Sequence, residues 1–199
     1  MILMRCIRFQ LALLAVPALG LTLDSYAQVR SVDTVNSKVI VHAFKSGILS
    51  GFADNHEVEA MISEGSVDEG KLHVKFVVDS RHMKVLDPQL SPDQRRQVEE
   101  RMLGPEVLDS AHYPRIVFES TNIEHVRQDQ FVVGGRLSLR GVTRPVSAMV
   151  RKEVERYVGM CTLKQRDFGI NPISIAGGTV KVKDELKIEF DVRATGGNN

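Results

Sequence analysis

The sequence predicts an all-β, antiparallel fold with one short surface helix, and three observations predict it. Apolar and charged residues alternate in several short runs, turn-forming residues separate these runs, and a single segment carries helix-capping residues. Alternation with a period of two is typical of strands that have one buried and one solvated face. Many short strands at regular spacing indicate a β-sandwich or a closed barrel of about eight strands.

The two clearest strands are the runs 72–78 and 186–192, in which every second residue is apolar. Further runs are predicted as strands by the same criterion: Lys38–Lys45, His56–Ile62, Arg115–Ile123, Phe131–Leu139, Val146–Val154, Tyr157–Arg166 and Thr179–Val182. Turn residues punctuate the chain at Asp68–Gly70, Gln128–Gln130, Arg140–Gly141 and Ala176–Gly178. The alternation of apolar and polar residues within these runs favours antiparallel pairing.

One segment breaks the strand rhythm and predicts a helix over residues 91–103. Ser91 has the side chain of an N-cap, Pro92 suits the first helical position, and Gln94 completes a capping box. Gly104 and the proline after it end the helix. The segment is strongly charged, so we expect it to lie on the surface, across the sheet or one end of a barrel.

The N-terminal 27 residues are predicted to be an export signal. Arg5 and Arg8 precede an apolar run over 11–23, and small residues before Gln28 suit cleavage near Ala27. The run is shorter than the roughly 20 residues that span a bilayer, so we do not expect an integral membrane protein after cleavage. Residues 28–195 are then one domain, and residues 196–199 are a frayed tail.

Composition places the remaining chain among globular proteins. The full sequence has 199 residues, 43% hydrophobic and 26% charged. Removing residues 1–27 takes away Arg5, Arg8 and Asp24, which leaves 24 basic and 24 acidic residues. This balance argues against a nucleic-acid partner, because phosphate binding needs clustered Lys and Arg. Only Cys161 remains of the two cysteines, so no internal disulfide can form in the exported protein.

Candidate catalytic and metal-binding residues are sparse. The histidines lack the close spacing of zinc sites, but His42 and His56 could meet across neighbouring strands with Asp54 nearby. This trio is a weak candidate for a metal-dependent or other enzymatic site. The sequence contains no phosphate loop or dinucleotide fingerprint, and nothing in it points specifically to an enzyme.

A closed barrel of about eight strands has an interior that holds either packed side chains or one slender ligand. Apolar inward-facing residues would suit a long hydrocarbon, because each buried methylene contributes about 0.8 kcal/mol. Composition does not separate a lipid-binding interior from a filled one. The residues predicted to face inward are Leu72, Val74, Phe76, Ile116, Phe118, Leu137, Leu139, Ile188 and Phe190.

Several motifs together resemble one known family. They are Asn36-Ser37-Lys38-Val39, the segment Leu103–Asp109 after the helix, the strand entry Tyr113–Ser120, the hairpin Gly135–Val146 and the segment Arg166–Ile170. Over about residues 32–193 the chain resembles the YceI-like family of bacterial periplasmic, lipocalin-like proteins. The resemblance implies a lipocalin-like barrel in the periplasm that binds a polyisoprenoid or another long-chain lipid.

The chain departs from this pattern at one motif. Members that resemble this branch often have Gly-His-Asn-His-Glu where this sequence has Ala53-Asp54-Asn55-His56-Glu57. An aspartate therefore replaces the first imidazole, which weakens the metal or enzymatic hypothesis, although Asp54 could still bind a hard cation.

The leading hypothesis is therefore a periplasmic module that sequesters or transports a long-chain apolar lipid inside a barrel. It requires no cofactor other than the bound isoprenoid or fatty-acid-like lipid itself. The alternatives are the enzymatic site at His42, Asp54 and His56, and a stress-related interaction protein whose barrel is filled. A homodimer is a possible partner state, and a stable homodimer in solution would favour the filled-barrel protein.

Overall fold

The computed structural model describes residues 29–46, 55–175 and 180–196. The predicted export signal, Asp54 and residues 197–199 of the predicted tail lie outside these ranges. The elements in chain order are β1 (Val29–Val32), β2 (Lys38–Ser46), β3 (His56–Glu59), β4 (Ile62–Asp68), β5 (His73–Asp79), β6 (Lys84–Val85), α1 (Pro92–Leu103), β7 (Arg115–Arg127), β8 (Gln130–Leu139), β9 (Val142–Glu153), β10 (Arg156–Lys164), β11 (Ser174–Ile175) and β12 (Val180–Thr195). Short 3₁₀ turns occupy Ser80–His82 and Gln165–Phe168.

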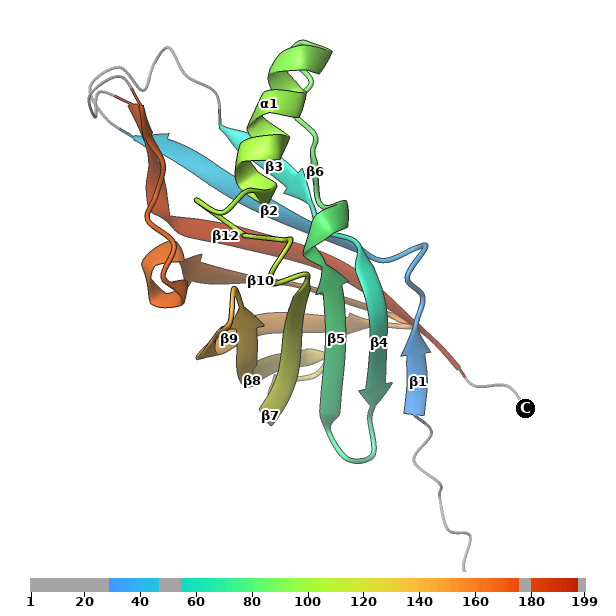
Figure 1. Ribbon diagram of the computed structural model, residues 1–199. Coiled ribbons are helices and arrows are strands. Elements are labelled where there is room, and N and C mark those ends of the chain that lie inside the picture. The colour runs from blue at the N-terminus through green and yellow to red at the C-terminus, as the bar shows by residue number, and fades with distance from the viewer. Residues whose placement is uncertain (1–28, 47–54, 176–179, 197–199) are drawn as a thin grey trace, which may run out of the picture.

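The strands form an antiparallel barrel that closes on itself, which confirms the predicted fold class (Figure 1). Eight strands make the ring in the order β1-β4-β5-β7-β8-β9-β10-β12, and β1 pairs back onto β12. The long strand β12 also pairs with β2, and β3 and β6 extend the wall beyond β2. Closure removes the free edges that an open sheet would expose.

Helix α1 begins and ends where the sequence predicts. The hydroxyl of Ser91 accepts a hydrogen bond from the Gln94 amide, and the Gln94 side chain accepts one from the Ser91 amide. Val98, Met102 and Leu103 lie on one face of the helix and pack against the barrel core. The helix therefore rests against β6 at one end of the barrel, as Figure 1 shows.

Several strand boundaries differ from the prediction, and two of the differences concern how runs divide or join. The run 56–62 divides into β3 and the start of β4, and β4 itself continues through residues with no apolar alternation. The runs 179–182 and 186–192 belong to the single strand β12, because an irregularity in register between Val182 and Leu186 interrupts the period of two. Local pattern does not reveal either feature, since both depend on the partner strand.

Register separates the inner from the outer wall. Residues directly opposite each other in paired strands share a face. Gly159 pairs with both Val150 and Phe190, and Phe190 pairs with Val39, whose side chain is buried. These four residues therefore face the interior, and their neighbours along each strand face outward.

Because Gly159 has no side chain, the Phe190 ring can lie close to the backbone of β10 on the inner face. A Cβ atom added there would lie 2.6 Å from Cζ of Phe190 and 2.3 Å from the carbonyl oxygen of Met149. The Phe190 ring therefore lies against the backbone of the neighbouring strand, where no side chain fits beneath it.

A cluster of polar side chains lies at the barrel end formed by the β4–β5 and β9–β10 turns. Glu69, in the first of these turns, accepts a hydrogen bond of 2.5 Å from the Tyr157 hydroxyl. The Lys152 ammonium lies 2.5 Å from the same carboxylate, and Arg30 lies 3.3 Å from it. Arg30 also reaches Glu155 in the second turn. We call Arg30, Glu69, Lys152 and Tyr157 the end cluster.

The hydrogen bonds of the end cluster hold the pKa of Glu69 below its ordinary value, with Lys152 the largest cause and Tyr157 the next. Burial, followed by the hydrogen bond to Glu69, raises the pKa of the Tyr157 hydroxyl. Both shifts keep Glu69 charged and Tyr157 protonated near neutral pH. The cluster therefore joins β1, β9, β10 and the β4–β5 turn through charge-assisted hydrogen bonds.

We expect Gly159→Ala to lower the free energy of unfolding by about 1–3 kcal/mol, because the new methyl group collides with backbone and with an aromatic ring. Gly134→Ala on β8 is a matched control, since its Cβ would find Asn122 no closer than 3.7 Å. Thermal unfolding followed by circular dichroism compares the two variants. Equal melting temperatures for both variants would contradict the close approach of Phe190.

We expect Glu69→Gln to lower the free energy of unfolding at pH 7 by about 1 kcal/mol, a value reduced by solvent screening of this partly exposed group. A lowered pKa in the folded state contributes stability above the ordinary pKa of 4.5, and this stability is lost as the pH falls through the folded pKa. The difference from the wild type should therefore shrink at pH 3. Urea titrations at pH 7 and pH 3 measure it, with Glu155→Gln as control, and a difference that is the same at both pH values would refute the role of the charge.

Candidate functional site

The barrel interior collects most of the residues predicted to face inward. Phe118 and Leu137 are buried core residues on β7 and β8. Six others are half-buried and pack against the core: Val74, Phe76, Ile116, Leu139, Ile188 and Phe190. The rings of Phe76 and Phe118 stack across β5 and β7 with centroids 5.1 Å apart. Strands β5, β7, β8 and β12 thus contribute apolar side chains to the interior.

Leu72 does not belong to this interior, and its prediction is wrong. It lies in the turn between β4 and β5 with a φ of 49°, and it is 54% exposed. The apolar alternation of β5 extends by chance one step into the turn, where the left-handed backbone directs the side chain away from the strand's inner face. Strand β5 begins one residue later, at His73.

The same register adds inward-facing residues that sequence reasoning did not single out. Val41 pairs with Ile188, and Cys161 pairs with Ile188 from the other side, so all three share the inner face. Val150 and Leu163 face inward by the same rule and pack against the core. Their positions within predicted strands were visible in the sequence, but the face on which each strand is buried follows only from its partners.

Cys161 is a thiol directed into the barrel. It is half-buried and makes no disulfide. Burial raises the pKa of the Cys161 thiol to about 11, so that the protonated form predominates near neutral pH. This environment suits a small apolar side chain and opposes a nucleophilic role.

The two candidate histidines lie on opposite sides of the wall. His42 pairs with Glu57, whereas His56 pairs with Ala43, and these pairs alternate along β2 and β3. On the outer face, the two ring nitrogens of His42 lie 3.5 Å from Glu57 and 3.3 Å from Glu189. The imidazoles therefore cannot bind one metal ion together.

His56 has a partner of its own. Its Nδ1 lies 2.5 Å from Oδ2 of Asp87, whose side chain is only 1% exposed. The other carboxylate oxygen of Asp87 accepts a hydrogen bond from the Glu57 amide. This pair fastens β3 to the segment after β6, which is a structural role. Across the part of the chain that the structure describes, no group of three or more His, Cys, Asp or Glu side chains is arranged to hold a metal ion.

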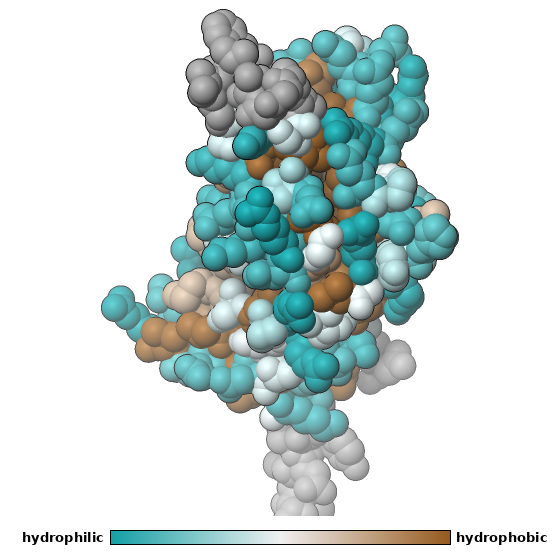
Figure 2. All heavy atoms as spheres, turned by 60° about the vertical axis from the view of Figure 1, so that its left-hand side comes forward, coloured by the Kyte–Doolittle hydropathy of each residue, from teal (hydrophilic) through white to brown (hydrophobic). Residues whose placement is uncertain are grey.

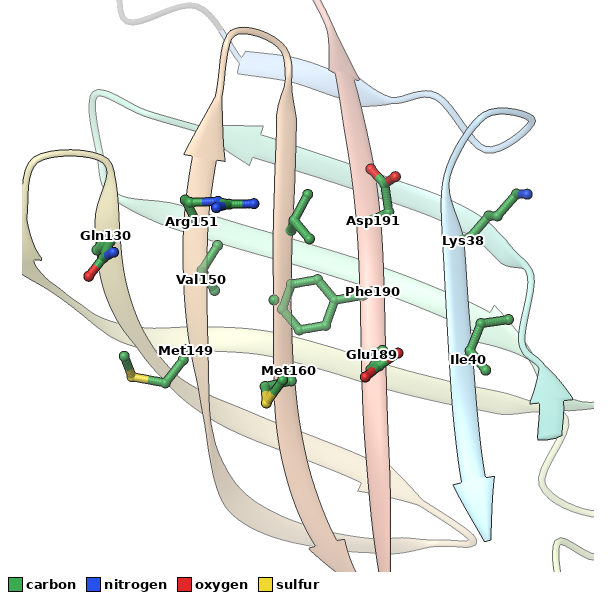
Figure 3. Close-up of a pocket in the computed structure, with 12 residues that line it drawn as sticks. Lys38, Ile40, Gln130, Met149, Val150, Arg151, Met160, Glu189, Phe190 and Asp191 are labelled. Atoms are coloured by element: carbon green, nitrogen blue, oxygen red, sulfur yellow. The ribbon is translucent and has the colours of Figure 1, made fainter. Parts of the chain in front are cut away.

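A groove on the outer wall is a second candidate site that sequence reasoning missed (Figure 3). It has a volume of about 650 Å³ and crosses β9, β10, β12 and β2. Most side chains around it belong to the outer face, since Met149 pairs with Met160 and Met160 with Glu189. We call this hollow the outer groove. The residues around it are Lys38, Ile40, Gln130, Met149, Val150, Arg151, Val158, Gly159, Met160, Glu189, Phe190 and Asp191.

The face of the molecule in Figure 2 carries both apolar and hydrophilic side chains. Apolar patches lie between hydrophilic side chains and do not form one continuous apolar face. Among the helices that the structure describes, none is long and apolar enough to cross a membrane.

Comparisons with known proteins agree with this architecture. A UPF0312 protein of Azotobacter vinelandii is 29% identical over 180 residues, which cover 79% of this chain and 86% of that protein. The crystal structure of Burkholderia cenocepacia BcnA superposes with a TM-score of 0.61 at 20% identity, covering 82% of this chain and 99% of BcnA. A mutant of the Campylobacter jejuni YCEI protein has a TM-score of 0.51 at 9% identity, covering 98% and 94% of the two chains.

The two structural likenesses show a shared fold. The family model of the YceI-like domain matches residues 31–194, which is nearly the whole described barrel. The strand pairing, the closed ring and this match agree on one conclusion: the chain belongs to the YceI-like family.

Proposed function

We propose that this protein is exported to the periplasm and binds a long-chain apolar lipid, polyisoprenoid-like in shape, inside its barrel. The observation that carries the proposal is the partial exposure of inward-facing apolar side chains. Phe76 and Ile188 point into the closed ring of strands, and Val41 on β2 faces the same side as Ile188, yet each of the three is only half-buried. Side chains that filled the interior completely would exclude solvent from these residues.

The distribution of polarity supports an elongated apolar ligand. The middle of the barrel presents aliphatic and aromatic side chains from β2, β5, β7 and β12. The end cluster adds charged groups at one end, and its members already bond to one another. A hydrocarbon placed in the middle would therefore bury apolar surface without leaving any of these polar groups unpaired.

The metal-dependent alternative receives no support from the geometry, because His42 and His56 face opposite sides of the wall. The filled-barrel alternative differs from lipid binding in one measurable respect, which is whether the interior accepts a ligand. Cys161 and its neighbour Thr162 can distinguish the two, since β10 places the first side chain inside and the second outside.

We expect the Cys161 thiol to react slowly with iodoacetamide, and still more slowly once lipid is bound. A pKa of about 11 instead of 9.0 lowers the thiolate fraction at pH 8 about a hundredfold. The alkylation rate measured by mass spectrometry should therefore rise about tenfold per pH unit up to pH 10 and should fall when delipidated protein is loaded with geranylgeraniol. Loading that leaves the rate unchanged would place the lipid outside the barrel.

We expect Cys161→Trp to abolish lipid loading and Thr162→Trp to preserve it. The first substitution adds a large side chain to the interior, whereas Thr162 is exposed on the outer face of the same strand. The chain contains no other Trp, so blue-shifted emission from the first variant and solvent-like emission from the second verify that each is folded as designed. Native mass spectrometry of protein isolated from its own cell envelope measures the bound lipid.

A folded Cys161→Trp variant that still carries as much lipid as the wild type would refute the proposal. Wild-type protein that carries no lipid and takes up neither geranylgeraniol nor palmitate would favour the filled barrel.

A further inference from the structure

The outer groove has two rows of side chains with different character. Strand register places Met149, Met160, Glu189 and Ile40 side by side in the first row. The second row lies two residues along each strand and contains Arg151, Val158, Asp191 and Lys38. Figure 3 shows both rows on neighbouring strands, with Arg151 and Lys38 at opposite edges of the groove.

The first row offers an apolar floor to solvent. Met149 is 53% exposed and Met160 is 48% exposed, and the two are directly opposite each other on β9 and β10. Methionine side chains are flexible and polarisable, so they adapt to apolar ligands of varied shape. Val158 and Ile40, both half-buried, continue this floor toward β2.

The two carboxylates in the groove already have cationic partners. Glu189 lies 2.6 Å from the Lys187 ammonium and 3.3 Å from His42. Asp191 accepts a hydrogen bond of 3.0 Å from Nε of Arg156. Each negative charge is therefore balanced within the protein, and neither is left to attract a cationic ligand.

The positive charge around the second row exceeds its negative charge. In the described ranges, Lys38 makes no ion pair within 4 Å, and Arg151 pairs only with the half-buried Glu153. The pKa of Asp191 is lowered first by its hydrogen bond to Arg156 and further by the charges of Arg193 and Lys38. The edge of the groove next to Lys38 therefore has a positive field.

We propose that the outer groove is a second binding site, separate from the barrel interior, for a single-chain amphiphile with an anionic headgroup. The chain lies over Met149 and Met160, and the headgroup lies beside Lys38. Four strands spaced about 4.8 Å apart span about 14 Å, enough for a medium-length alkyl chain laid across them. A volume of about 650 Å³ is within the range of small-molecule sites.

The proposal does not depend on lipid binding in the interior. Val150, Gly159 and Phe190 border the groove, but strand register places the side chains of Val150 and Phe190 on the opposite, inner face of the wall. The wall between the two sites is therefore a single layer of backbone. A ligand can occupy the groove whether the barrel interior is open or filled.

The test uses the methyl groups of methionine as local reporters. The described residues include Met149 and Met160 in the groove, Met61 exposed elsewhere, Met83 in the core and Met102 on α1. Protein labelled with ¹³C at the methionine methyl groups is titrated with dodecyl phosphate below its micelle concentration and followed by NMR. Dodecyltrimethylammonium serves as the probe of opposite charge.

We expect the methyl signals of Met149 and Met160 to shift saturably with dodecyl phosphate, while Met61 shifts little although it is 45% exposed. Lys38→Glu should weaken the apparent affinity about fivefold, as expected for the reversal of a solvent-exposed charge next to the headgroup. Arg136→Glu is the matched control, because Arg136 is exposed on the outer face of β8 and does not border the groove.

Several outcomes would overturn the proposal. Equal responses to both probes, equal effects of Lys38→Glu and Arg136→Glu, or no shift at Met149 and Met160 would each exclude an anion-selective site in the groove. Shifts confined to Met83 and Met102 would locate the probe in the barrel interior instead. Broadening of the Met149 and Met160 signals with protein concentration alone would assign the groove to contact between two copies of the chain.

Discussion

The pairing that closes the barrel is the constraint on which the rest of the structure depends. β12 pairs with β10 along one edge and with both β1 and β2 along the other, and β1 in turn pairs with β4. Because the ring is closed, each strand has a definite inner and outer face, and successive side chains alternate between two different environments. The apolar interior and the outer groove are two sides of the same wall, made from alternate residues of the same strands.

Much of this fold could be predicted from local sequence, because its main signals are local. Period-two alternation identified most of the long strands, and the capping residues around Ser91 located α1. The export signal stays a prediction, since residues 1–28 lie outside the described ranges. The local signal fails where contacts elsewhere in the chain determine the structure. Strand β6 has only two residues, too few to show a period. Leu72 continues the alternation of β5, but it lies in a turn whose backbone directs its side chain outward.

The candidate sites were less predictable for the same reason. His42 and His56 are 14 positions apart, and only the register of β2 against β3 shows that they face opposite sides. The end cluster joins Arg30 to Glu69 and Glu69 to Tyr157 across sequence separations of 39 and 88 residues. Met149 and Met160 lie within recognisable strands, but their outward direction follows only from the register of β9 against β10.

If the closed ring surrounds space for a long hydrocarbon, electron density should show the ligand in place. A crystal structure of the protein purified from its own cell envelope, without added detergent, should contain continuous elongated density among Val41, Phe76 and Ile188 that no protein atom explains. An interior in which these side chains meet one another and leave no room for a hydrocarbon chain would contradict the account.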